Sequence, residues 1–197
     1  MAGNPQKILI VGAGVIGLYL AWQLSLKGHK VSVYEKSSKE RSWKKSCSTL
    51  VSERIRNFIP MDDSFIENKI SGCLINFPKK TVRLDFRPVH LVLSRPAVLA
   101  RLLELAQKEG AEVFFEKDIK KIPEGFDKII GCDGALSKIR ESLALSIPRF
   151  RLGVQFFQKE KDGSGLVETW PTKNGFCWRI PREKKRSGGC SKIRKPL

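Results

Sequence analysis

Three glycines near the amino terminus have the spacing of a phosphate-binding loop. They stand in the run Gly12-Ala13-Gly14-Val15-Ile16-Gly17, a G-x-G-x-x-G pattern. The first glycine permits a tight strand-to-helix turn, the second admits a pyrophosphate close to the backbone, and the third lets the helix pack against the strand. The free amides and the positive end of the helix dipole then favour an anion. The residues of this run are the first candidate cofactor-binding residues.

An acidic residue stands where a dinucleotide-binding unit needs one. Glu35, followed by Lys36, comes after the second apolar run. An acid about 20 residues beyond the glycine pattern, at the end of the second strand, accepts hydrogen bonds from a ribose. Glu35 and its neighbour Lys36 therefore join the candidate cofactor-binding residues.

The residues around the glycine pattern predict a strand, a helix and a second strand. Ile8–Val11 is a short apolar run, a helical period follows up to Gly28, and residues 31–34 form another apolar run. A secretory signal peptide is the alternative, because Lys7 precedes an apolar stretch, but no small-residue cleavage site closes that stretch. The stretch is also interrupted by glycines, whereas a membrane span needs about 20 apolar residues. The pattern favours a Rossmann-like dinucleotide-binding unit.

Bulk composition limits the class of protein. The chain has 197 residues, 41% of them hydrophobic, which is enough to fill a core. Its five cysteines are an odd number without a C-x-x-C pair, so the sequence indicates neither a zinc site nor a disulfide scaffold, and a reduced, cytoplasmic chain fits best. The net charge of +17 suits an anionic membrane surface, an anionic ligand or nucleic acid. Nucleic acid is the least favoured, because no nucleic-acid-binding motif accompanies the charge.

The rest of the chain predicts an α/β domain followed by antiparallel strands. A hairpin is expected within residues 70–93, a helix from Pro96 to Gly110, and strands that return to the first sheet within 111–116 and 126–130. Strand-like runs then begin a second, antiparallel layer. The predicted domains are 1–148 (FAD/NAD(P)-type Rossmann-like), 149–182 (an incomplete antiparallel substrate domain) and 183–197 (a basic disordered tail, as a truncated or frameshifted product would carry).

Three separated patches resemble the FAD-dependent oxidoreductases of the p-hydroxybenzoate hydroxylase superfamily. The first is the glycine pattern with Glu35, and the second is Ser94-Arg95-Pro96-Ala97-Val98-Leu99. The third is the stretch from Gly131 to Arg140, similar to the motif G-x-D-G-x-x-S-x-x-R. The resemblance implies that FAD is the cofactor and that Arg95 reaches its pyrophosphate. It further implies that Gly131, Asp133 and Gly134 hold the cofactor region.

Two further patches are similar to the geranylgeranyl reductase branch of that superfamily. Residues 45–52 resemble its cysteine-containing loop, which makes Cys47 the candidate catalytic residue, although the glycine that usually follows the cysteine is absent. Residues 175–182 resemble its G-(Y/F)-x-W-x-x-P-(K/R) segment, with Phe176 and Trp178 as candidate substrate-binding residues. The resemblance implies a flavoprotein of lipid biosynthesis that reduces isoprenoid double bonds by hydride transfer from reduced flavin. The basic surface would suit peripheral docking on an anionic membrane.

Other functions stay open at this point. The resemblance covers about residues 6–182, the amino-terminal half of such enzymes, and a later G-D-A/S-x-G segment is missing. One alternative is an FAD-dependent aromatic monooxygenase. Another is a non-catalytic nucleotide-binding remnant, and the third is nucleic-acid binding through the basic tail.

Overall fold

The chain forms two compact units, each built from two separate segments. Unit 1 comprises residues 1–45 and 96–148, and unit 2 comprises residues 46–95 and 149–197. The structure is a computed structural model that describes residues 4–158, 162–182 and 186–193. The units are described separately below.

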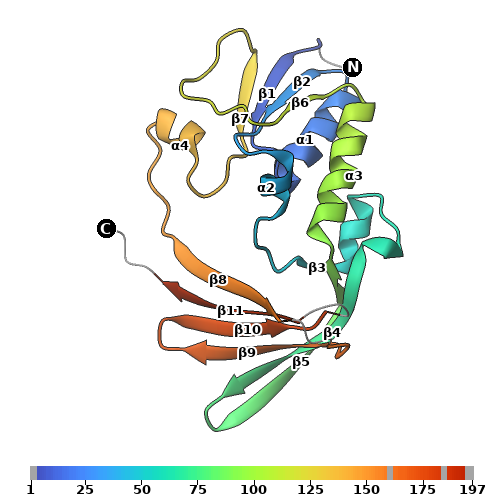
Figure 1. The fold of residues 1–197 in the computed structure, drawn as a ribbon, viewed down its shortest axis with the longest axis vertical. Helices are drawn as coiled ribbons and strands as arrows, with labels where there is room; N and C mark the ends of the chain where they lie inside the picture. The colour runs from blue at the N-terminus through green and yellow to red at the C-terminus, as the bar shows by residue number, and fades with distance from the viewer. Residues whose placement is uncertain (1–3, 159–161, 183–185, 194–197) are drawn as a thin grey trace. The chain divides into compact units, whose positions relative to one another are not determined.

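Unit 1 is organised on a parallel four-stranded sheet (Figure 1). The strands lie in the order β6-β2-β1-β7, and the apolar side chains of β1 from Ile8 onward are buried. Because parallel neighbours need a crossover connection, helix α1 (Val15–Leu26) joins β1 to β2. The bounds of the strands are β1 Lys7–Val11, β2 Lys30–Tyr34, β6 Glu112–Phe114 and β7 Lys128–Gly131.

Three further helices complete the described part of unit 1: α2 (Lys39–Trp43), α3 (Arg95–Lys108) and α4 (Lys138–Ser142). Helix α3 buries apolar side chains at a spacing of three and four residues, which is the period of an amphipathic helix: Val98, Leu99, Leu102, Leu103 and Ala106. A core cluster of Leu9, Val11, Ile119 and Ile139 packs beneath β1 and β7. These contacts fix the glycine-rich turn and the loop that follows β7.

Unit 2 is organised on one seven-stranded sheet in the order β3-β5-β4-β9-β10-β11-β8. Strands β4 and β9 pair in parallel, and the other neighbours pair antiparallel. Two short 3₁₀ helices, η1 (Glu53–Asn57) and η2 (Asp63–Phe65), connect β3 to β4. The strand bounds are β3 Leu50–Ser52, β4 Ile66–Phe77, β5 Lys80–Leu93, β8 Arg151–Gln158, β9 Leu166–Thr172, β10 Gly175–Ile180 and β11 Arg186–Ile193.

The register of unit 2 assigns side chains to the two faces of the sheet. Across β11, Trp178 of β10 lies in line with Gln155 of β8, and Phe176 lies in line with Gly153. Side chains directly opposite each other share a face of the sheet. We call the face that carries Phe176, Trp178 and Gln155 the Trp178 face. The opposite face carries exposed apolar side chains: Leu152, Val154, Phe156 and Trp170.

The predicted fold class is confirmed, but the antiparallel parts are joined differently. The hairpin expected within 70–93 and the strands expected after 149 form a single sheet, because Gly72 of β4 pairs with Leu166 of β9. Within the predicted disordered tail, Arg186–Ile193 forms β11, an inner strand between β10 and β8. The neighbouring strands on both sides form hydrogen bonds with the backbone of β11. The strand can therefore form without an alternation of apolar residues in its sequence. Residues 183–185 and 194–197 of the predicted tail lie outside the described residues.

Cysteine chemistry departs from the sequence-based expectation. Cys47, Cys73 and Cys132 carry free thiols, whereas Cys177 of β10 is disulfide-bonded. The expectation of a chain with only reduced cysteines is therefore wrong at Cys177. A C-x-x-C pair is not needed for a disulfide, because folding can bring together cysteines that are separated in sequence.

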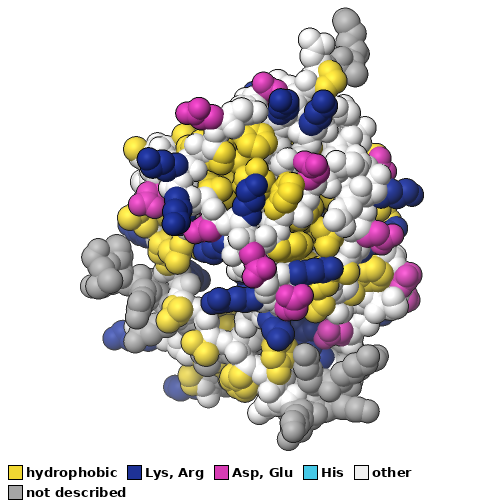
Figure 2. Space-filling model, turned by 45° about the horizontal axis from the view of Figure 1, so that its top comes forward, with side chains coloured by type: hydrophobic (Ala, Val, Ile, Leu, Met, Phe, Trp, Pro, Cys, Tyr) yellow, Lys and Arg dark blue, Asp and Glu magenta, His cyan; other side chains and the backbone are white. Residues whose placement is uncertain are grey.

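The surface mixes charges of both signs. On the face shown in Figure 2, lysine and arginine side chains are interspersed with acidic and apolar ones. Among the residues that the structure describes, no helix has both the length and the apolar content to cross a membrane.

Candidate functional site

The glycine-rich turn after β1 is packed too tightly for side chains at two of its positions. Gly12 has φ +106°, its amide donates to the Tyr34 carbonyl (2.7 Å), and a Cβ there would lie 2.4 Å from the Cys132 carbonyl oxygen. A Cβ on Gly17 would lie 1.9 Å from the Gly12 carbonyl oxygen. Glycine is therefore required at both positions by the packing of the unit itself.

Gly14, the middle glycine, has a different environment. It is the N-cap of α1 with φ −77°, no side chain caps its amides, and a Cβ there would meet nothing within 4 Å. Ala13 is buried, while Ile16 in the first turn is 65% exposed. The open space at the start of α1, together with Val15 and its neighbours, fits the approach of a pyrophosphate to backbone amides.

Glu35 is buried at the end of β2 and braces the glycine-rich turn. It is 3% exposed. Its Oε2 accepts a hydrogen bond from the Ala13 amide (3.0 Å), and its Oε1 accepts one from the Ser37 amide (3.0 Å). Each carboxylate oxygen keeps a further lone pair, so the residue can also accept from a ribose hydroxyl. The bracing contact to Ala13 is a role that the sequence did not reveal.

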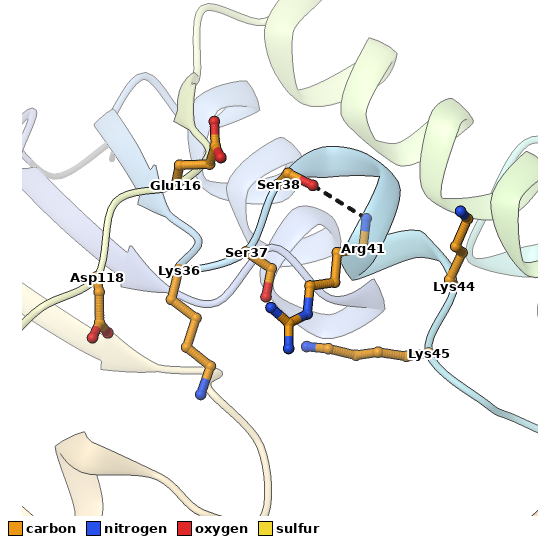
Figure 3. A pocket seen from close by; sticks show the side chains of 8 residues that line it. All are labelled: Lys36, Ser37, Ser38, Arg41, Lys44, Lys45, Glu116 and Asp118. Carbon is orange, nitrogen blue, oxygen red and sulfur yellow. Dashed lines mark hydrogen bonds between the residues drawn. The ribbon is translucent and has the colours of Figure 1, made fainter.

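A basic cavity lies beside this acid in unit 1. Its volume is about 810 Å³. It is lined by Lys36, Ser37, Ser38, Arg41, Lys44, Lys45, Glu116 and Asp118. Figure 3 shows Lys36, Arg41 and Lys45 directed towards a common open space, with Glu116 turned away from it. The cavity gives the end of β2 a positive field that suits an anionic nucleotide.

Asp133 caps α4 with one oxygen and leaves the other unused. Its Oδ2 accepts from the amides of Lys138 (2.7 Å) and Ile139 (3.4 Å), while Oδ1 is buried without a partner among the described residues. A buried acceptor without a donor is unfavourable, so this oxygen is available to a hydrogen-bond donor of a ligand or of water. Gly134 has φ +87° and the neighbouring Gly131 has no room for a side chain, since its Cβ would lie 2.8 Å from the Ile139 Cβ.

Two arginines of the sequence motifs have different environments. Arg140 turns back on its own loop and donates to the carbonyls of Ala135 (3.0 Å) and Gly134 (3.2 Å). Arg95 is the first residue of α3, and its Nε is buried without an acceptor among the described residues. A guanidinium with an unused donor is suited to a phosphate oxygen. Arg140 thus stabilises the loop, whereas Arg95 keeps a donor for a ligand.

Unit 2 contains the other predicted residues: Phe176 and Trp178 lie on the Trp178 face of its sheet, and Cys47 lies on the loop before β3. The ring centroids of Phe176 and Trp178 lie 5.7 Å apart with the planes tilted by 50°. Cys47 is exposed on the loop before β3, and its carbonyl accepts a hydrogen bond from Gln155 Nε2 (3.4 Å). The Trp178 indole N–H is buried without an acceptor among the described residues. Unit 2 thus carries an aromatic pair on strand β10 and a free thiol on the loop before β3.

Comparison with known proteins identifies the fold. Residues 7–47 match the family model of FAD-dependent oxidoreductases. A geranylgeranyl bacteriochlorophyll reductase-like protein of Thermoplasma acidophilum superposes with a TM-score of 0.77 at 22% identity, over 96% of this chain and 57% of that one. PqsL, a probable FAD-dependent monooxygenase of Pseudomonas aeruginosa, has a TM-score of 0.77 at 16% identity, over 97% and 61%. The chain has the fold of the FAD-dependent oxidoreductases.

A curated relative supports this flavoprotein fold by sequence. Kynurenine 3-monooxygenase of Flavobacterium psychrophilum is 28% identical over 169 residues, which is 71% of this chain and 38% of the relative. The chain therefore spans about two fifths of that relative's length. The relatives are enzymes. The family match and the FAD-dependent structural neighbours agree with FAD as the predicted cofactor. The open turn at Gly14 and the unpartnered Asp133 Oδ1 fit such a group.

Several residues of this flavoprotein fold escaped the sequence reasoning. Gln155 and Arg182 contact the Cys47 loop, and Thr49 within that loop accepts a hydrogen bond from Arg182. Arg182 closes the segment that resembles the reductase branch, but nothing in its neighbours indicates that its charge is buried. A contact map from related sequences could have found these residues, because each pairs with a segment far away in the chain.

Proposed function

We propose that unit 1 holds FAD and that unit 2 binds an isoprenoid chain, whose carbon–carbon double bond is reduced. The observation that carries the proposal is the aromatic pair Phe176–Trp178, which shares a sheet face with the anchor of the Cys47 loop. Aromatic rings of this kind present broad apolar area, which suits an unbranched or branched hydrocarbon chain. A bound FAD supplies the hydride when it is reduced.

The residues that we propose for FAD binding, all but Arg95 in unit 1, have separate tasks. The amides at the start of α1, opened by Gly14, receive the pyrophosphate, and the Arg95 guanidinium supplies a second set of donors. Glu35 accepts from the ribose while it braces the turn. Asp133 Oδ1 accepts from a further hydroxyl of the cofactor, which would satisfy this buried oxygen.

In unit 2 the Cys47 thiol is the candidate group for holding the proton that the second carbon receives. It is exposed, so a substrate can reach it. Phe176 and Trp178 orient the chain and exclude water from the reacting carbons. The net charge of +17 would favour docking on an anionic membrane from which such a substrate is taken, which flotation with anionic and neutral vesicles can measure.

Substrate reduction by the purified chain tests this proposal. The protein is loaded with FAD, reduced with dithionite without oxygen, and given geranylgeranyl diphosphate; mass spectrometry then reports added hydrogens. We expect Trp178→Ala to lose this activity and Trp170→Ala, on the opposite face, to keep it. A protein that stays colourless after incubation with FAD would overturn the proposal and favour the non-catalytic remnant.

Aromatic hydroxylation is the second candidate function. It is favoured by the match to a kynurenine 3-monooxygenase, and the fold is shared with a probable monooxygenase. The two functions differ in their use of oxygen. Hydroxylated product from an aromatic amino acid such as kynurenine, formed only with oxygen and an electron donor, would replace the reductase proposal.

A further inference from the structure

Arg182 is a buried cation that reaches into the loop carrying Cys47. Its side chain is 4% exposed and forms an ion pair with Glu67 of β4 through Nη1. Its Nη2 donates to the Ser48 carbonyl (2.7 Å) and to Thr49 Oγ1 (3.1 Å). The guanidinium carbon also lies 5.6 Å from the centroid of the Phe157 ring. One side chain thus joins β4, β8 and the residues that directly follow Cys47.

Thr49 has a backbone conformation that a threonine rarely adopts. Its φ is +51°, in the left-handed region, where a β-branched residue is strained. Its hydroxyl donates to the Leu93 carbonyl (2.6 Å) while it accepts from Arg182, and the Leu93 amide donates to the Thr49 carbonyl (3.1 Å). The unfavourable conformation persists because contacts on both sides hold it.

Asn68 holds the segment that carries Arg182. The Asn68 side-chain amide of β4 donates to the Pro181 carbonyl (3.1 Å) and to the Ser164 carbonyl (3.1 Å), and Asn68 is 8% exposed. Pro181 is fully buried. The guanidinium is therefore presented to the loop from a rigid base, as a positioning group requires.

We infer that Arg182 is the positioning residue of the Cys47 loop, and that it keeps Thr49 in the left-handed conformation which sets the direction of Cys47. The importance of that loop for catalysis rests on the proposed function, but the positioning itself does not. The ammonium group of a lysine could also form the ion pair with Glu67. Only the planar guanidinium reaches Glu67, the Ser48 carbonyl and the Thr49 hydroxyl together.

Hydrogen exchange of the chain without FAD or substrate tests the inference. The rate for the peptide 46–52 is measured by mass spectrometry in Arg182→Lys, which keeps the charge beside Glu67, and in Arg182→Met. We expect about tenfold faster exchange of this peptide in both variants, the order of magnitude set by release of one left-handed residue. The strands β4 and β10 should keep their exchange rates in Arg182→Lys.

Arg179→Met is the matched control. Arg179 lies on strand β10, three residues before Arg182, pairs with Glu168 and shares the opposite face with Trp170. Its loss should leave the 46–52 peptide unchanged. In the Arg182→Met background, Thr49→Asn should slow the exchange again, because asparagine tolerates the left-handed region. The double variant Arg182→Met/Glu67→Gln avoids an unpaired buried charge should Arg182→Met fail to fold.

Two results would overturn the inference. One is wild-type exchange of peptide 46–52 in a folded Arg182→Lys protein and in the double variant. The other is equal acceleration by Arg179→Met. Neither result depends on a cofactor, so a failure of FAD binding would affect only the proposed function.

Discussion

Gly14 and Gly17 belong to the same turn, but a side chain at the two positions would meet different surroundings. A Cβ at Gly17 would overlap the Gly12 carbonyl oxygen, whereas one at Gly14 would enter open space. Packing therefore explains the glycine at position 17, whereas the space beside position 14 is open to a ligand. A side chain at position 17 should therefore affect the stability of the turn, and a side chain at position 14 should affect the binding of a ligand.

Gly14→Ala should fold normally and lose FAD. We expect the free energy of unfolding to change by less than about 1 kcal/mol and the Kd for FAD to rise at least tenfold, because the methyl group occupies the space of the pyrophosphate. Urea unfolding and quenching of flavin fluorescence measure the two quantities. Gly163→Ala, another position whose Cβ would meet nothing, is the control and should change neither. Unaltered FAD affinity in Gly14→Ala would remove the pyrophosphate from this turn.

Glu35→Gln should weaken both the turn and the cofactor site. The carboxylate accepts from two amides, whereas the glutamine side chain has one acceptor oxygen and must turn its NH₂ towards the other amide. We expect a loss of about 1–3 kcal/mol in the free energy of unfolding. Chemical denaturation measures it, with Glu116→Gln at the rim of the cavity as the control. A stability equal to wild type would contradict the bracing role.

The free thiols should react in the order of their exposure. Burial raises the pKa of Cys132, to which the Asp133 charge adds, and burial also raises the pKa of Cys73. At pH 8 the thiolate fraction of both is therefore lowered, so iodoacetamide should label exposed Cys47 first. Because the folded-state pKa is raised, the stability that these two thiols contribute is fully present below their ordinary pKa and is lost as pH rises from there through the raised folded-state pKa. Peptide mass spectrometry checks the order, and faster labelling of Cys132 than of Cys47 would refute it.

At the scale of elements, two side chains cap helix α4, and they differ in whether they can also contact a ligand. Ser137 Oγ accepts from the Arg140 amide (3.0 Å), while Asp133 Oδ2 accepts from the Lys138 amide. Only Asp133 has a second, unpartnered oxygen. The same short helix therefore combines a structural cap with a candidate cofactor contact.

Asp133→Ala and Ser137→Ala should separate these duties. Each removes a cap, so we expect each to lower the free energy of unfolding by about 1 kcal/mol. Only Asp133→Ala should also weaken FAD binding, because it removes the buried free oxygen. Thermal unfolding and FAD titration of both variants measure the effects. Equal FAD affinity in the two variants would assign Asp133 to capping alone.

At the scale of the whole molecule, unit 2 exposes apolar side chains on the face opposite Trp178. Leu152, Val154 and Phe156 are 53%, 63% and 53% exposed, and they alternate along β8. A contiguous apolar surface of this kind binds hydrophobic dyes and lowers solubility. Polar substitutions there should improve solubility without touching the proposed site.

Val154→Lys should reduce the fluorescence of bound anilinonaphthalene sulfonate and raise the soluble yield. The introduced charge interrupts the apolar row at its most exposed member. Gln107→Lys, at an exposed position of helix α3, adds the same charge away from this row and is the control. Dye fluorescence that falls equally in both variants would attribute the effect to net charge rather than to the apolar row.

Local features of the chain were predictable because their signals lie within short segments. The glycine spacing, the helical period of α3 and the acid after β2 can each be recognised within a short stretch of sequence. The cap and the free oxygen of Asp133 were not predictable, because they depend on the approach of α4. The contact from Arg182 to the Ser48 carbonyl joins residues 134 positions apart, which no local pattern reports.

The sequence by itself determined the βαβ unit and indicated its cofactor. It did so because strand and helix periods, glycine geometry and an acid at a strand end are consequences of local chemistry. Only the tertiary structure decided that the early hairpin and the late strands form one sheet, through Gly72 and Leu166. It alone also set the burial of Glu35 and Arg182, since a charge is stabilised inside a protein only by partners that folding brings to it.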